Sequence, residues 1–225
     1  MSMTQIPYRR HDILLLHNNC RDDAYKTALE MNPSLPPDLL KKIIHAPIPP
    51  IVKMQEQMRD GLIEVGFSSP FFQNGTRTRA KSLIPLCGIN DVITPFNAIS
   101  RAPNLKHTHI RNALDALMHY AKQNAIDMGV YGSCALELIT SLPYITPRSD
   151  IDLCVKGSIG DYLAFYPAAC DIAQQYGVRF DIEALCANGD GVKLAELLSD
   201  QKTILCKGLY EIRLCEKTSL PLFES

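Results

Sequence analysis

Two aspartates, Asp150 and Asp152, stand one residue apart in the alternating segment S-D-I-D-L-C-V. A strand has a side-chain period of two, so both carboxylates are expected on one face, with Ile151 and Leu153 on the other. Carboxylates placed side by side repel each other unless a cation lies between them. The spacing therefore predicts a metal-dependent site for phosphate chemistry. The alternative is that Asp150 is a turn residue after Pro147 and that Asp152 is an exposed strand position.

A third carboxylate follows on a second alternating segment, Val178 to Leu185. Arg179, Asp181 and Glu183 are expected on the face opposite the apolar residues of this strand. Asp181 is the preferred third carboxylate, and Glu183 replaces it if the strand register differs by one pair. The alternative for Asp181 is an ordinary solvent-facing strand residue.

Residues that suit phosphate oxygens precede Asp150 and Asp152 in the sequence. Gly132 and Ser133 follow a short apolar run, where glycine permits close backbone approach and a helix N-terminus favours anions. Arg148 comes two residues before Asp150. Arg77 and Arg79 share a face if their segment is extended, and arginine suits bidentate phosphate contacts. A solvated loop is the alternative for residues 73–82.

The remaining periodicity predicts the elements that must position these residues. Glu137, behind Ser133, is interpreted as a solvated helix residue and not as a ligand. Helices are expected over 21–30, 38–44, 107–124, 161–176 and 192–198, and strands over 12–17, 51–54, 62–67, 150–155, 178–185, 203–206 and 210–214.

The composition is that of a globular protein and limits the possible partners. The chain has 225 residues, 46% hydrophobic and 21% charged, which suits one large domain or two small ones. A boundary is expected near Ile99 to Asn104, dividing an α+β substrate- or partner-binding domain, 1–103, from a catalytic domain, 104–225. The formal net charge of −1 supplies no basic stripe for nucleic acid. No apolar run is long enough to span a membrane.

Cysteine usage and the N-terminal residues bear on the compartment. Eight cysteines are present, none in a C-x-x-C pair and most inside apolar segments. Met1, Ser2 and Met3 do not begin a signal-peptide pattern. We therefore expect reduced cysteines in a cytoplasmic protein. His107 and His109 have no neighbouring ligands for zinc and are interpreted as polar residues that open a helix.

The order of these motifs resembles a known fold. A Gly-Ser turn after a strand, a helix, Asp-x-Asp on the next strand and an aspartate on a later strand resemble the polymerase-beta nucleotidyltransferase superfamily. The resemblance implies an α+β protein. Its C-terminal nucleotidyltransferase domain would have a mixed sheet with flanking helices, preceded by a small mixed α+β domain.

The segment that contains these motifs is more specific than their order alone, and it reads G-S-C-A-L-E-L-I-T-S-L-P-Y-I-T-P-R-S-D-I-D-L. It is similar to the signature of the phosphoribosyl-dephospho-coenzyme A transferases of malonate decarboxylase, also called malonate decarboxylase holo-acyl-carrier-protein synthases. The similarity extends to the segments R-H-D-I-L-L, V-G-F, R-T-R-A and T-P, at residues 10–15, 65–67, 77–80 and 94–95.

This resemblance implies a reaction. A phosphoribosyl-dephospho-CoA unit passes from its triphosphate precursor, triphosphoribosyl-dephospho-CoA, to a serine of the apo acyl-carrier subunit of malonate decarboxylase, and pyrophosphate is released. Asp150, Asp152 and Asp181 would be the catalytic metal ligands. Mg²⁺, as two ions, suits these hard oxygen ligands and the triphosphate.

Two other functions stay open. One is a nucleotidyltransferase that uses ATP to modify another protein or a small molecule. The other is a binding module with this fold and no catalysis. Three strand carboxylates disfavour the second, because a degenerate site is expected to lose at least one of them.

Overall fold

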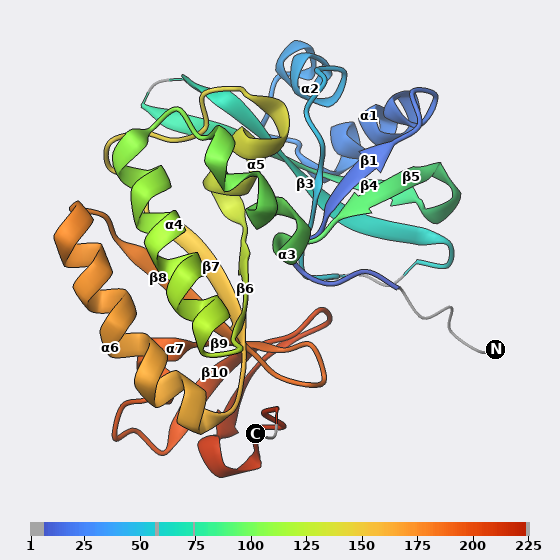
Figure 1. Ribbon diagram of the computed structural model, residues 1–225. Coiled ribbons are helices and arrows are strands. Elements are labelled where there is room, and N and C mark those ends of the chain that lie inside the picture. Colours follow the sequence, from blue (N-terminus) through green and yellow to red (C-terminus); the bar gives the residue numbers. More distant parts are fainter. Residues whose placement is uncertain (1–6, 57–58, 74, 224–225) are drawn as a thin grey trace. The chain divides into compact units, whose positions relative to one another are not determined.

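The computed structural model describes residues 7–223 except 57, 58 and 74, and it is an α+β structure. Its internal contacts define two units (Figure 1). Unit 1 comprises the chain up to Thr94 together with Leu142–Tyr144, and unit 2 comprises Pro95–Ser141 and Ile145 onward. A short segment of the central loop thus belongs with the N-terminal residues.

Unit 1 is built on an antiparallel five-stranded sheet in the order β4-β3-β2-β1-β5. The amphipathic stretch 37–44 forms a helix because Pro37 occupies its first turn and its apolar residues Leu40, Ile43 and Ile44 are buried. Its strands are β1 (Ile13–Leu16), β2 (Ile51–Val52), β3 (Leu62–Gln73), β4 (Thr76–Pro85) and β5 (Ile89–Ile93), and its helices are α1 (Cys20–Met31), α2 (Pro37–Ile44) and the 3₁₀ turn η1 (Leu86–Gly88).

Unit 2 contains a mixed six-stranded sheet in the order β11-β10-β9-β8-β7-β6. Strands β7 and β8 run parallel, whereas the other neighbouring pairs are antiparallel. The strands are β6 (Asp127–Val130), β7 (Ile151–Lys156), β8 (Phe180–Leu185), β9 (Gly191–Lys193), β10 (Thr203–Lys207) and β11 (Ile212–Glu216). The parallel pair is the feature that positions the candidate site.

Helices cover both faces of this sheet in part. The long helices α4 and α6 pack against each other and contact β6 and β8 (Figure 1). Gly129 lies on the other face, where a Cβ would meet Pro95 at 2.9 Å, so α3 fits closely against β6. The helices are α3 (Pro95–Ala98), η2 (Ile99–Asn104), α4 (Thr108–Gln123), α5 (Gly132–Thr140), α6 (Ile159–Tyr176), α7 (Leu194–Leu197) and η3 (Lys217–Ser219).

Most of the predicted elements are confirmed, with two corrections. Residues 192–198 were expected to form one helix, but they are split between strand β9 and the single turn α7. Val192 is buried and pairs with Ala184 of β8, so sheet pairing prevails over local helix propensity. The alternative of a solvated loop for residues 73–82 is wrong from Thr76 on, because this part is strand β4.

The contact units divide earlier than the boundary expected near Ile99 to Asn104. Pro95–Asn104 forms α3 and η2, which pack on β6, α4 and α5 of unit 2. Among the helices of the described residues, none is long and apolar enough to cross a membrane.

Helix α6 begins with a complete capping box that offers a direct stability test. Ser158 Oγ accepts a hydrogen bond from the backbone N–H of Asp161, and the Asp161 carboxylate accepts one from the Ser158 N–H. Replacing Ser158 by alanine is expected to lower the free energy of unfolding by about 1 kcal/mol. Urea denaturation at neutral pH measures this, and equal midpoints for variant and wild type would contradict it.

The same capping box makes part of this stability depend on pH. The hydrogen bonds from Ser158 lower the pKa of Asp161 in the folded protein. A lowered carboxyl pKa stabilises the fold above the unfolded-state pKa, and this contribution disappears as the pH falls through the folded-state pKa. The difference between wild type and Ser158→Ala should therefore shrink in acid.

Candidate functional site

The turn between β6 and α5 lies directly against Asp152. Gly132 has φ +65°, in the left-handed region that favours glycine. A Cβ at this position would overlap Oδ2 of Asp152 and lie 2.9 Å from its Cγ. The Tyr131 N–H also donates to the Asp152 carbonyl at 3.0 Å. The absence of a side chain at Gly132 therefore allows the Asp152 carboxylate to approach the start of α5, where Ser133 is the second residue.

Asp181 lies beside Asp152 on the neighbouring strand. The two residues are register partners in the parallel pair β7 and β8, so their side chains project from the same face. Asp181 also binds Lys193, the last residue of β9, whose Nζ is 3.1 Å from each carboxylate oxygen. The hydrogen bond to Asp181 raises the pKa of Lys193. The carboxylates of Asp152 and Asp181 and the ammonium group of Lys193 thus share this face.

Asp150 is held differently from the other two aspartates. It precedes β7, and its Oδ1 accepts a hydrogen bond from Nε of Arg179 at 2.5 Å. The ion pair is open to solvent, with side-chain exposures of 49% for Asp150 and 70% for Arg179. Arg179 therefore neutralises the first carboxylate of the Asp-x-Asp motif.

Glu183, the alternative third carboxylate, is buried. Its side chain is 3% exposed and binds Nζ of Lys207 at 2.6 Å. The Asp181 side chain, by contrast, is 37% exposed. Of the two alternatives, Asp181 has the better access for a ligand, whereas the Glu183–Lys207 pair is buried on the same face of the sheet.

Burial and the nearby carboxylates raise the pKa values of two side chains near the turn, Tyr131 and Cys134. Burial raises the pKa of the Tyr131 hydroxyl, and the negative charges of Glu183, Asp152 and Asp181 raise it further. Burial, with smaller contributions from Glu137 and Asp152, raises the pKa of Cys134 to about 12. Tyr131 therefore stays a neutral hydroxyl group, and Cys134 is not a thiolate nucleophile at physiological pH.

The interpretation of Glu137 as a solvated helix residue is wrong. Its side chain is 10% exposed, and Oε1 lies 3.1 Å from Nε2 of His107. Oε2 accepts a hydrogen bond from the Ile145 N–H at 2.7 Å. Glu137 thus connects α5 to the start of α4 and to the loop that leads to Asp150. His107 is the N-cap residue of α4, as expected for a polar residue that opens a helix.

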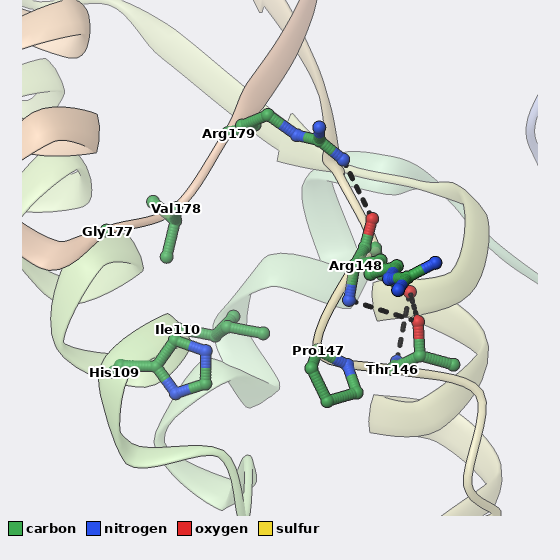
Figure 2. Close-up of a pocket in the computed structure, with 9 residues that line it drawn as sticks. His109, Ile110, Thr146, Pro147, Arg148, Gly177, Val178 and Arg179 are labelled. Atoms are coloured by element: carbon green, nitrogen blue, oxygen red, sulfur yellow. Dashed lines mark hydrogen bonds between the residues drawn. The ribbon is translucent and has the colours of Figure 1, made fainter.

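A pocket of about 270 Å³ lies next to Asp150, within unit 2. Figure 2 shows His109 and Ile110 of α4 on one side, Val178 on another, and the Arg179 side chain reaching the Arg148 carbonyl. That hydrogen bond, from Nη2 of Arg179, measures 2.8 Å. The loop is closed by Thr146 and Ser149, whose hydroxyls lie 3.0 Å apart. Arg148 is exposed and lines this pocket, which contains both polar and apolar groups.

The other two predicted phosphate-binding arginines belong to unit 1. Arg77 and Arg79 lie on strand β4, where their alternate positions place them on one face. Nη2 of Arg77 donates to the Tyr144 carbonyl at 2.6 Å, and the guanidinium lies 5.3 Å from the centre of the Tyr144 ring. Arg79 is exposed. Arg77 therefore has a structural role in holding the segment Leu142–Tyr144.

The donor set at Asp152 and Asp181 can be compared with what Mg²⁺ requires. Mg²⁺ is typically held by one or two carboxylates plus water and substrate phosphates. Two carboxylates on register-paired positions fit that requirement. In the described part of the chain no group of three or more His, Cys, Asp or Glu side chains is arranged to hold a metal ion. The set of three aspartate ligands stays a prediction.

Lys193 and Arg179 are the site residues that were not predicted. Arg179 was expected on the carboxylate face, but its partner depends on the pairing of β7 with β8, which no local pattern reveals. Lys193 lay inside the segment expected to be a helix. The alternation of Lys193 with Val192 and Gly191 in a strand was the available signal.

Curated proteins with sequences similar to this chain share one description. A protein from Bradyrhizobium diazoefficiens, named phosphoribosyl-dephospho-CoA transferase, is 29% identical over 127 residues, which are 53% of this chain and 56% of that protein. A protein of the same name from Xanthomonas campestris pv. campestris is 28% identical over 149 residues, 63% of this chain and 68% of that protein. The first alignment spans little more than half of the relative's length.

The other comparisons differ in outcome. No solved structure matches the chain. The family model described as the phosphoribosyl-dephospho-CoA transferase MdcG C-terminal domain matches residues 98–218, which include the turn at Gly132, both register-paired aspartates and Lys193. Because this match covers more than half of the sequence, the chain belongs to the family of the phosphoribosyl-dephospho-CoA transferase MdcG C-terminal domain.

Proposed function

We propose that this protein transfers the phosphoribosyl-dephospho-CoA group from triphosphoribosyl-dephospho-CoA to a serine of the apo acyl-carrier subunit of malonate decarboxylase. The serine oxygen forms a bond to the α-phosphorus, and the bond from that phosphorus to the leaving pyrophosphate breaks. Family membership and the names of the relatives support a transferase. The observation that carries the proposal is the register pair Asp152 and Asp181 beside the turn at Gly132.

A nucleotidyltransferase-like fold is part of this proposal. It is supported by the order of β6, the turn, α5 and β7, and by the parallel pairing of β7 with β8. This arrangement brings an Asp-x-Asp strand next to a strand that carries a further aspartate, and both follow a Gly-Ser turn. The N-terminal unit is proposed to hold the precursor or the carrier subunit.

Magnesium is the proposed cofactor, as two ions. Asp152 and Asp181 would hold the first, and Asp150 could contribute if it leaves Arg179. When bound, such ions stabilise the negative charge that develops on the phosphate oxygens. The partly exposed carboxylate of Asp181 is also the proposed acceptor of the serine proton, at an Oδ atom.

Phosphate binding is assigned to backbone amides and to arginine side chains. The backbone amides of Gly132 and Ser133 open helix α5 and would receive the leaving pyrophosphate. Arg148, exposed beside the pocket, and Arg79, exposed on unit 1, are the proposed arginine contacts. Arg77 remains a weaker candidate, because its guanidinium is bound to Tyr144.

Intact-mass spectrometry of the carrier subunit tests this function. The apo subunit is incubated with the protein, Mg²⁺ and triphosphoribosyl-dephospho-CoA, and we expect a gain equal to the prosthetic group. Excess EDTA should abolish the gain, and added Mg²⁺ should restore it. A parallel reaction with ATP alone should leave the mass unchanged.

Two outcomes would overturn the proposal. An adenylyl-sized gain with ATP, and none with the precursor, would favour an ATP-dependent nucleotidyltransferase. No transfer from either donor, with the precursor still bound, would favour a binding module without catalysis.

A further inference from the structure

The position of Lys193 would allow its side chain to contact a ligand bound at the candidate site. It ends strand β9 opposite Glu183, on the face that also carries Asp152 and Asp181. Its backbone is anchored on both sides, because Val192 and Leu194 are fully buried. The side chain is nevertheless 41% exposed. An anchored backbone and an exposed ammonium group suit a lysine that exchanges one ion-pair partner for another.

The contact between Lys193 and Asp181 involves both carboxylate oxygens. Nζ is 3.1 Å from Oδ1 and 3.1 Å from Oδ2, so the ammonium group lies across the open end of the carboxylate. A divalent cation that uses Asp181 needs at least one of the same oxygens. Two cations at one carboxylate repel each other, so Lys193 must yield part or all of its contact.

The second lysine on this face shows what a structural ion pair looks like here. Lys207 binds Glu183 at 2.6 Å, and the two side chains are 25% and 3% exposed. Removing either partner would leave a buried charge. The Lys193–Asp181 pair is partly open to water, where an ion pair is weak and can exchange.

We propose that Lys193 competes with the divalent cation for Asp181 and, once displaced, binds a phosphate oxygen of the precursor. This inference rests on the proposed function, since it concerns the same site. Lysine suits the second role, because its ammonium group has three donors on a flexible stem. When Lys193 leaves the Asp181 carboxylate, the incoming triphosphate replaces this carboxylate as its negatively charged partner. Lys193 is thus a phosphate-binding residue that also sets the affinity for the metal.

Binding of Mn²⁺ to the full-length protein tests the first half. The free Mn²⁺ signal in electron paramagnetic resonance is titrated for wild type, Lys193→Met, Lys193→Arg and Lys202→Met. We expect Lys193→Met to bind Mn²⁺ about two- to five-fold more tightly, in keeping with an exposed ion pair. Lys193→Arg, which keeps the cation, should resemble wild type. Lys202, exposed elsewhere in unit 2, controls for the lost unit of charge.

A double variant shows whether the effect passes through Asp181. In the Asp181→Asn background, Lys193→Met should no longer tighten Mn²⁺ binding. Unchanged or weaker binding by Lys193→Met would overturn the competition. Equal tightening in Lys193→Met and Lys202→Met would also overturn it, because the effect would then be one of net charge.

Binding of inorganic tripolyphosphate in the presence of saturating Mn²⁺ tests the second half. Calorimetry should show Lys193→Met binding this anion about ten-fold more weakly than wild type and Lys202→Met, as for a lost charge-assisted hydrogen bond. Equal affinities would overturn the phosphate contact. Neither measurement uses the carrier subunit or the transfer reaction, so failure of the proposed function would leave both results interpretable.

Discussion

Replacing Asp152 by asparagine is expected to lower the rate of transfer to the carrier subunit by at least about 100-fold, the scale for one essential electrostatic group. Asp152 lies against Gly132 and beside Asp181, so its charge is central to the site. Asparagine keeps the shape and removes the charge, which isolates the electrostatic contribution. Single-turnover rates of wild type and variant, measured by intact mass, give the ratio.

The matched control for this change is Asp171→Asn. Asp171 is exposed on helix α6, and the substitution removes the same charge from unit 2. Its transfer rate should equal that of wild type. Thermal unfolding should confirm that Asp152→Asn remains folded. A variant that is folded and still transfers at most of the wild-type rate would show that Asp152 is not part of the catalytic site.

The pair Asp152 and Asp181 illustrates what local sequence can predict. Strict alternation places each aspartate on one face of its own strand, because side chains on a strand alternate with a period of two. The structure confirms both strands and their register partnership. The sequence already favours Asp181 over Glu183, and the structure adds the physical reason: Glu183 is buried against Lys207 of β10, whereas Asp181 is partly exposed.

Residues whose partners are distant in sequence could not be assigned in this way. Glu137 has an ordinary helix position, and its burial arises from His107 on another helix and from the Ile145 N–H after a loop. Lys193 belongs to a strand of three residues, Gly191–Lys193, that exists only because β8 and β10 pair with it. Short strands of this kind depend on tertiary pairing more than on local propensity.

Three carboxylates at or near the site form ion pairs that differ in their exposure to solvent. Asp150 is neutralised by Arg179, Asp181 by Lys193, and Glu183 by the buried Lys207. Exposed pairs exchange easily, whereas a buried pair does not. We therefore expect binding of the proposed cation and binding of phosphate on this face to be coupled through the basic side chains that balance these charges.

Replacing Gly132 by alanine is expected to abolish transfer, with a loss of at least about 100-fold, because small misplacements of a catalytic group have effects of this size. The new Cβ would overlap Oδ2 of Asp152. At φ +65° the substitution should also lower the free energy of unfolding by about 1–2 kcal/mol.

Gly61→Ala separates the two effects, since Gly61 has φ +71° and nothing within 4 Å of its Cβ position. Chemical denaturation should show a similar loss of unfolding free energy in both variants. Single-turnover measurements should show slower transfer in Gly132→Ala alone. Equal transfer rates in the two variants would mean that the close approach of Gly132 to Asp152 has no part in catalysis.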